Sequence, residues 1–206
     1  MQYNLLGKTG MNVSRIGFGG IPIQHVNEDE VKKIVSKCIG AGINFFDTAR
    51  GYTVSEELLG KAFQGKRDRV YIATKTMARD RDGMMSEVEI SLKNLQTDYI
   101  DLYQFHNVGS LDEYDKIMGK DGAYEALEKL QKEGAVKHIG ITSHKLPIME
   151  KALETECFAT IQFPLSVVER QAEEIFKTAH EKNIGTIAMK PMAGGALRDG
   201  RKALKC

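Results

Sequence analysis

Four ionisable side chains within residues 47–106 could together move a proton, and they are Asp47, Tyr52, Lys75 and His106. Three of them stand at or near the end of a short apolar run typical of a buried strand, and Tyr52 follows Asp47 after the link Thr-Ala-Arg-Gly. A buried carboxylate or ammonium is costly unless it is paired. We therefore expect Asp47 and Lys75 to satisfy each other.

The chemistry open to such a group is acid–base catalysis. A tyrosine phenol has a reference pKa of about 10, and a neighbouring ammonium stabilises the phenolate, so we expect Lys75 to lower the pKa of Tyr52. A neutral His106 would donate a hydrogen bond to an oxygen of the substrate. The four residues would then form a tuned general acid facing a polar carbon–oxygen bond.

Each of these residues also has an ordinary structural explanation. A lone Lys at a strand end is usually a surface residue whose stem lies along apolar surface, and a lone His is more often a hydrogen-bonded core residue. A catalytic role is favoured over these structural explanations because the four residues occur together. Three consecutive apolar runs bring an acid, a base and a His to the same edge, with a phenol beside them.

Seven apolar, β-branched runs recur along the chain and alternate with helical patterns, which predicts a parallel sheet with helices outside it. The runs occupy 14–20, 43–49, 70–76, 99–106, 136–142, 160–166 and 185–191. Helices are predicted at 28–41, 84–95 and 123–134, from Pro147 onward, and around Ile175 and Ala179. Asn27, with Glu30 three residues later, is a capping pattern for the first of them.

Closing such a sheet gives a TIM (β/α)8-type barrel, and an open doubly wound sheet is the competitor. The open sheet usually has a glycine-rich phosphate loop after its first strand, but GFGGIPIQ lacks the G-x-G-x-x-G spacing, and GGALRDGRK has Arg where a P-loop needs Lys. We therefore favour a single barrel domain over residues 1–206. Only seven strands are evident where a closed barrel needs eight, and residues 198–206 contain no apolar run for another.

The N-terminal stretch NLLGKTGMNVSRIG is predicted to form a small hairpin that turns at Gly7–Gly10 and covers the N-terminal mouth of the barrel.

Composition excludes several classes of function. The 206 residues are 42% hydrophobic and 28% charged, as in ordinary globular proteins, and a net charge of +1 gives no electrostatic reason for nucleic acid as a partner. No apolar run approaches the roughly 20 residues of a membrane helix, and the N-terminus lacks the pattern of a signal peptide. Three widely spaced cysteines predict neither disulfides nor a zinc site, so we expect a reduced, cytoplasmic setting and no metal.

In their order and spacing, several motifs resemble the aldo-keto reductase superfamily, whose fold is a (β/α)8 barrel. These motifs are FGGIP, FFDTARGY with SEELLGKAF, IATKT, SLKNLQTDYIDLYQFH, HIGITSH, IQFPLS and AMKPMAGG. The resemblance implies reduction of an aldehyde or ketone by NADPH, with NADH as the alternative. It places the family's catalytic tetrad on the four residues named above. Tyr52 would protonate the carbonyl oxygen as hydride arrives from C4 of the nicotinamide.

The resemblance also implies a set of cofactor-binding residues. Ser143, His144 and Gln162 match positions that hold the nicotinamide carboxamide, although many members have Asn where this chain has His144. Lys190, Pro191 and Met192 would line the pyrophosphate, Gly20 and Ile21 would lie near the ribose, and Asp47 belongs to both sets. The chain departs from the family at its C-terminus, where the eighth strand and the next loop usually grip the adenosine and its 2′-phosphate.

The sequence also leaves open two other functions and the possibility that the chain self-associates or belongs to a longer protein. A barrel without its eighth strand could bind a nicotinamide nucleotide as a non-catalytic sensor or regulatory subunit. A metal-dependent hydrolase built on the five histidines is disfavoured, because no H-x-H or H-E-x-x-H motif occurs. The first and seventh strands would have unpaired edges, which favour self-association or a longer natural chain that closes the barrel.

Overall fold

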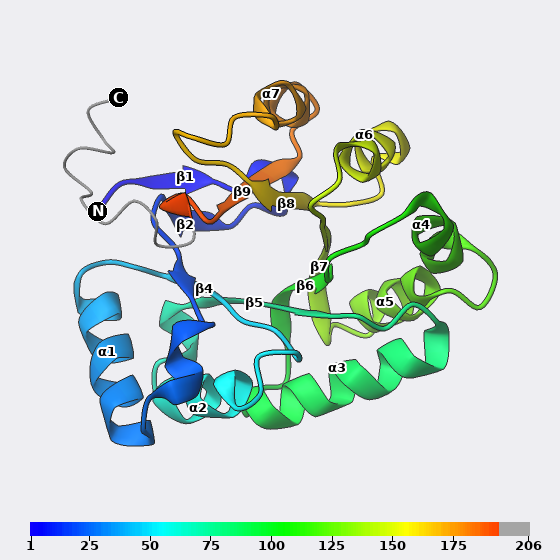
Figure 1. Cartoon of the computed structure of the whole chain (residues 1–206). Helices are drawn as coiled ribbons and strands as arrows, with labels where there is room; N and C mark the ends of the chain where they lie inside the picture. The colour runs from blue at the N-terminus through cyan, green and yellow to red at the C-terminus, as the bar shows by residue number, and fades with distance from the viewer. Residues whose placement is uncertain (194–206) are drawn as a thin grey trace.

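Seven parallel strands form one curved sheet in the computed structural model, which describes residues 1–193 (Figure 1). Their order is that of the sequence: β3 (Phe18–Gly19), β4 (Phe45–Asp47), β5 (Tyr71–Thr76), β6 (Ile100–Phe105), β7 (Val136–Thr142), β8 (Thr160–Pro164) and β9 (Gly185–Met189). All seven predicted strands are confirmed. The described residues contain no eighth parallel strand, and the prediction for residues 198–206 lies outside them.

Helices cover the outer side of the curved sheet (Figure 1). They are α1 (Glu28–Gly40), α2 (Ser55–Ala62), α3 (Arg81–Leu95), α4 (Leu111–Met118), α5 (Ala123–Lys132), α6 (Leu146–Thr155) and α7 (Glu173–Glu181). The predicted cap of α1 is confirmed, since Asn27 Oδ1 accepts a hydrogen bond from Glu30 N at 3.0 Å. Helices α2 and α4 were not predicted, because eight residues give only two turns of periodicity. Ser110, which caps α4 by accepting from Glu113 N, was a signal for it.

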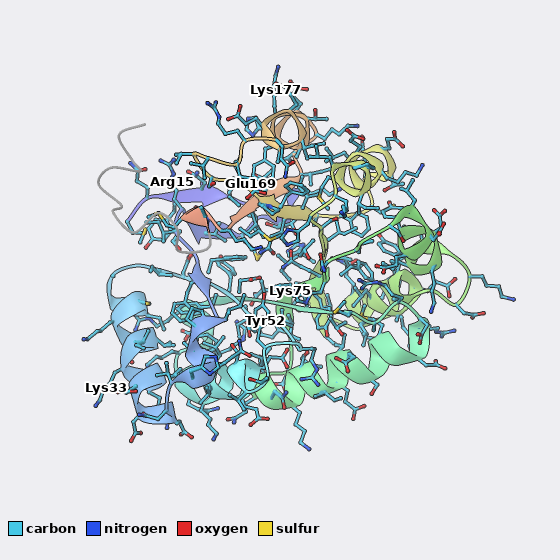
Figure 2. All side chains as sticks on the ribbon, in the orientation of Figure 1. Arg15, Lys33, Tyr52, Lys75, Glu169 and Lys177 are labelled. Atoms are coloured by element: carbon cyan, nitrogen blue, oxygen red, sulfur yellow. The ribbon has the colours of Figure 1, made fainter. Side chains whose placement is uncertain are left out.

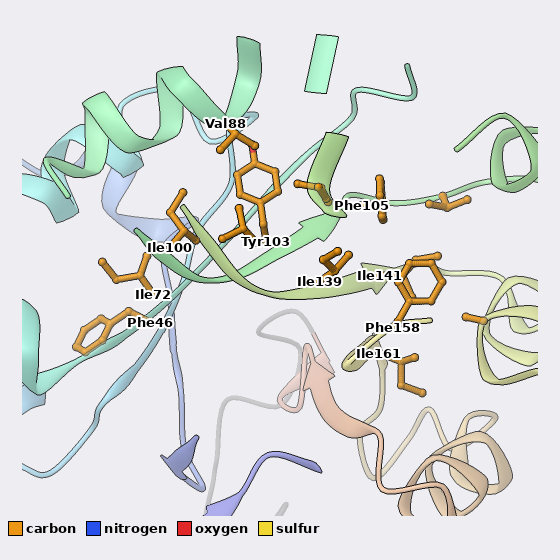
Figure 3. Close-up of a cluster of buried hydrophobic side chains, with 14 of the residues drawn as sticks. Phe46, Ile72, Val88, Ile100, Tyr103, Phe105, Ile139, Ile141, Phe158 and Ile161 are labelled. Carbon is orange, nitrogen blue, oxygen red and sulfur yellow. The ribbon is translucent and has the colours of Figure 1, made fainter. Parts of the chain in front are cut away.

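The pleat of the strands separates the hydrophobic core from the polar site. Successive residues of a strand point to opposite faces. Most outward-facing residues are apolar and buried against the helices, and Figure 3 shows Phe46, Ile72, Tyr103, Ile139 and Ile161 among them. The inward positions change character along β4, β5 and β6. They are apolar at the N-terminal end, as at Ala73 in β5, and polar at the C-terminal end, as at Lys75.

The N-terminal hairpin closes the barrel's N-terminal mouth, as predicted. Strands β1 (Tyr3–Leu5) and β2 (Asn12–Ser14) pair antiparallel around a short 3-10 turn, η1 (Gly7–Thr9). Leu6, Met11 and Val13 pack on three inward-facing sheet residues, Phe45, Ala73 and Leu102. The hairpin also bonds to the residues before two distant strands: Ser14 N donates to Asn44 Oδ1 at 2.7 Å, and Lys8 N donates to Asn183 O at 2.7 Å. It therefore connects β4, near one end of the open sheet, with β9 at the other end.

Helices α2 and α3 pack together through Gly60, which yields a test of the fold. A Cβ at Gly60 would lie 2.3 Å from Asn94 O, a backbone atom. Alanine in a helix is normally favoured over glycine by about 1 kcal/mol, but here overpacking should dominate, so we expect Gly60→Ala to lower the free energy of unfolding by about 2 kcal/mol. Gly40→Ala, at the end of α1 with open space around it, is the control and should leave stability unchanged or slightly raised. Chemical denaturation measures both, and equal effects would contradict the close α2–α3 contact.

Candidate active site

The structure brings all four predicted catalytic residues together at the C-terminal ends of neighbouring strands. Asp47 ends β4, Lys75 lies near the end of β5, and His106 directly follows β6. Lys75 is 3% exposed, and its Nζ donates to Asp47 Oδ2 at 2.7 Å and to Thr48 O at 2.8 Å. The predicted ion pair is confirmed, and the backbone carbonyl of Thr48 gives the ammonium a second acceptor.

Tyr52 lies in the loop between β4 and α2, next to Lys75 (Figure 2). Lys75 Nζ is 4.9 Å from the centroid of the phenol ring. The Tyr52 and His106 rings meet edge to face, with centroids 5.8 Å apart and planes at 86°. Phenol, imidazole and ammonium therefore form one cluster.

The pKa of Tyr52 differs from the expectation. Burial raises this pKa above its ordinary value, and the charge of Lys75 offsets only part of the rise. Desolvation penalises the charged phenolate more than a single nearby ammonium stabilises it. The expectation of a lowered pKa was wrong in its net direction, although Lys75 does act as expected. Tyr52 therefore remains a protonated donor at neutral pH.

His106 is a neutral imidazole, as expected. Burial first, and then the positive charges of Lys75 and Arg79, lower the pKa of His106 to about 4. Its Nδ1 is buried and has no hydrogen-bond partner among residues 1–193. An unprotonated Nδ1 fits that setting better than an N–H without an acceptor, so we assign the proton to Nε2.

The predicted cofactor residues lie along the same C-terminal edge of the sheet. Gly20 N donates to Asp47 O at 2.7 Å, and a Cβ at Gly20 would lie 2.6 Å from Ser55 Oγ, so this position needs glycine. Ile21 follows and is 53% exposed. Lys190, Pro191 and Met192 directly follow β9.

Ser143 and His144 directly follow β7, and Gln162 lies in the adjacent strand β8. Ser143 Oγ donates to Val108 O at 2.6 Å and accepts from Lys145 N at 2.9 Å, which holds the hydroxyl at the end of β7. His144 is exposed, and Gln162 is buried in β8 opposite Thr142. Gln162 Nε2 has no hydrogen bond within the described residues, and its Oε1 uses one of two lone pairs. The amide can therefore still donate and accept, which fits a carboxamide ligand.

The family model for the Aldo/keto reductase family matches residues 15–204. The chain belongs to the aldo-keto reductase family.

Individual relatives agree with this membership. The chain is 30% identical to an uncharacterized oxidoreductase, YqkF, of Bacillus subtilis, over 97% of this chain and 67% of that protein. It is 33% identical to L-galactose dehydrogenase of Arabidopsis thaliana, over 97% of this chain and 68% of the relative. The chain thus spans about two thirds of the length of these curated relatives.

Solved structures of family members match the fold. The holo form of aldo-keto reductase AKR11C1 from Bacillus halodurans has a TM-score of 0.85 at 31% identity, with 95% of this chain and 68% of that chain covered. An aldo-keto reductase from Klebsiella pneumoniae in complex with NADPH has a TM-score of 0.81 at 29% identity, with 97% and 72% covered.

Sequence reasoning missed a partly buried ionic network on the outer side of β5. Arg50 lies between Asp47 and Tyr52, and its guanidinium donates to Glu56 Oε2 at 3.1 Å and to Glu87 Oε2 at 2.9 Å. Its backbone N donates to Lys75 O at 2.9 Å. Arg50 therefore fixes the loop that carries Tyr52 against the end of β5.

Glu56 is the centre of this network and is 1% exposed. Besides Arg50, it accepts from Thr74 Oγ1 at 2.7 Å, Ser91 Oγ at 2.8 Å and Asn94 Nδ2 at 3.2 Å. The burial of Glu56 could have been predicted from helical spacing, because Glu56 lies three residues before Leu59 and so falls on the apolar face of α2.

The remaining polar clusters and hollows do not compete with this site. Within residues 1–193 there is no group of three or more His, Cys, Asp and Glu side chains that could hold a metal ion. In the same residues, no helix is long and apolar enough to span a membrane. Two surface hollows of about 330 and 390 Å³ lie against the N-terminal hairpin, at the opposite mouth of the barrel, lined in part by Asn12 and by Met11.

The depressed pKa of His106 predicts a pH dependence of stability. The folded pKa, about 4, lies below the ordinary 6.5, so the unfolded chain binds more protons between these values. The resulting penalty is absent above pH 6.5 and grows as the pH falls towards 4. Relative to His106→Asn, the wild type should lose on the order of 2 kcal/mol of unfolding free energy between pH 6.5 and pH 4. This loss is smaller than the whole pKa difference would give, because the imidazole ring is partly exposed to solvent. Denaturant titrations at several pH values measure this, and parallel curves would contradict it.

The network around Glu56 predicts a rescue. Arg50→Met leaves a buried carboxylate without its cation and should lower the free energy of unfolding by about 3 kcal/mol. Adding Glu56→Gln removes the uncompensated charge and should restore most of that loss. Chemical denaturation of the single and double variants measures both steps. A double variant no more stable than Arg50→Met would show that charge burial is not the cause.

Proposed function

We propose that this chain reduces aldehydes or ketones to alcohols with NADPH, with NADH as the alternative cofactor. The observation that supports this most is the buried Lys75–Asp47 pair, which lies beside a phenol and a neutral imidazole. Family membership and the NADPH complex of the Klebsiella relative support the same assignment. The cofactor, when bound, supplies hydride from the nicotinamide ring.

The residues of the chain have distinct roles in this proposal. Tyr52 is the general acid, and its proton goes to the carbonyl oxygen while the carbonyl carbon is reduced. The raised pKa of Tyr52 keeps that proton in place before the reaction. The charge of Lys75 then stabilises the phenolate that remains, and water returns the proton. His106 donates from Nε2 to the carbonyl oxygen and so orients it.

The predicted cofactor residues along the edge of the sheet would contact different parts of the nucleotide. Ser143, His144 and Gln162 would hold the carboxamide, because they present hydroxyl, imidazole and amide groups from adjacent strand ends. Gly20 and Ile21 would face the ribose. Lys190, with Pro191 and Met192, would lie against the pyrophosphate, where its exposed ammonium can meet a phosphate charge.

Further proposals concern the chain as a whole. Residues 1–206 form a single domain that acts in the cytoplasm on a small carbonyl compound. Within the described residues, β3 and β9 each pair with only one neighbouring strand. These open edges favour self-association, and sedimentation of the purified chain measures it, with a compact monomer as the contradicting result.

Turnover tests the proposed function. NADPH oxidation with a panel of aldehydes should be measurable for the wild type and should fall by roughly 10²- to 10⁴-fold in Tyr52→Phe. Tyr124→Phe is the matched control, because Tyr124 lies in α5 and donates to Cys157 O, away from the site. Tight NADPH binding by calorimetry without turnover would instead indicate a non-catalytic sensor.

A further inference from the structure

Gln104 is a fully buried amide inside the barrel that the acid–base mechanism does not use. It lies in β6, two residues before His106, and its inward-facing side chain is beside Lys75 in the strand register. Gln104 Nε2 donates to Gln162 Oε1 at 2.9 Å and lies 3.3 Å from Asp47 Oδ1. It thus contacts one predicted catalytic residue and one predicted cofactor residue.

Packing alone does not explain this amide. Its Oε1 is buried without a partner among residues 1–193, and an unpaired buried polar atom costs stability. The preceding inward residue of β6 is Leu102, so the strand accommodates an apolar side chain on this face. A residue such as Met would avoid the cost. Compared with an apolar residue such as Met, the amide adds only the two contacts made by Nε2.

The acceptors fix which way the amide points. Asp47 uses Oδ2 to bind Lys75, so its Oδ1 remains as an acceptor. The amide NH2 of Gln104 donates to this carboxylate and to the Gln162 oxygen at once, whereas the flipped amide would place its single oxygen against both of these acceptors.

Gly140 makes the bridge possible. Strand β7 lies between β6 and β8, and Gly140 is its residue in register with Gln104. A Cβ at Gly140 would lie 3.1 Å from Gln104 Cγ and 2.3 Å from Thr160 Oγ1. Because glycine has no side chain, Gln104 can reach across β7 to Gln162.

We propose that Gln104 is a positioning residue that links the Asp47–Lys75 pair to Gln162, and through it to the nicotinamide carboxamide. The connected groups run from β5 through β4 and β6 to β8. Gln104 restrains the rotation of the Asp47 carboxylate and holds the Gln162 amide in a fixed orientation. This inference rests on the proposed function only in assigning Gln162 to the cofactor.

The test uses Gln104→Met, which keeps the length of the side chain and removes the amide. NADPH affinity, measured by calorimetry, should fall roughly 3- to 10-fold, as expected for one lost hydrogen bond, while the thermal midpoint is unchanged or higher. Thr160→Val is the matched control, because Thr160 Oγ1 is also buried but has no partner among residues 1–193. It should leave NADPH affinity unchanged. A loss in both variants would indicate a general packing defect and overturn the proposal.

A double-mutant comparison separates positioning from structure. If Gln104 acts through Gln162, the effect of Gln104→Met on NADPH affinity should disappear in a Gln162→Met background. An undiminished effect would overturn the link.

A readout without cofactor separates this inference from the proposed function. In the free chain, the side-chain NH2 signals of Gln162 in ¹⁵N NMR should shift in Gln104→Met and stay in place in Thr160→Val. Unshifted signals would overturn the inference even in an active enzyme. Shifted signals in a chain that neither binds nor oxidises NADPH would support the bridge and refute the proposed function.

Discussion

The buried ion pair of Lys75 and Asp47 is the constraint on which the site depends. Lys75 is almost fully removed from water, and an ammonium in that setting is tolerated only with close acceptors. The chain supplies two, Asp47 Oδ2 and Thr48 O, from the end of the neighbouring strand. Strands β4 and β5 must therefore end close together, and the loop that begins at Thr48 must turn directly above them. The position of Tyr52 follows from this geometry.

Both faces of β5 hold this loop in place. Lys75 points inward to the ion pair, whereas Thr74 and Thr76 point outward, where they donate to Glu56 and Glu87. Arg50 binds the same two carboxylates from the loop. Alternation along a single strand thus joins the Lys75–Asp47 ion pair to a second network on the other side of the sheet.

The sequence predicted the strands and the clustering of the candidate catalytic residues because both depend on local pattern. Apolar runs identify buried strands, and parallel strands of one sheet bring their ends to one edge, so Asp47, Lys75 and His106 could be grouped without a structure. The net pKa of Tyr52 could not be predicted, because it depends on how far burial outweighs a charge. Gln104 was missed for a similar reason. Its bond to Gln162 joins residues 58 positions apart and exists only because Gly140 leaves the space between them.

The two halves of the site differ in how firmly the sheet supports them. The predicted catalytic residues lie at or beyond the ends of β4, β5 and β6, each of which is paired on both sides. Gly20 and Lys190 follow β3 and β9, which within the described residues have one neighbouring strand each. A strand with an unpaired edge has fewer hydrogen bonds to fix its C-terminal loop. The half that contains the proposed acid–base residues is therefore supported entirely by strands that are paired on both sides. The half proposed to bind the nucleotide depends on how the sheet edges are covered, and the proposed bridge through Gln104 connects Asp47 to the β8 side of that half.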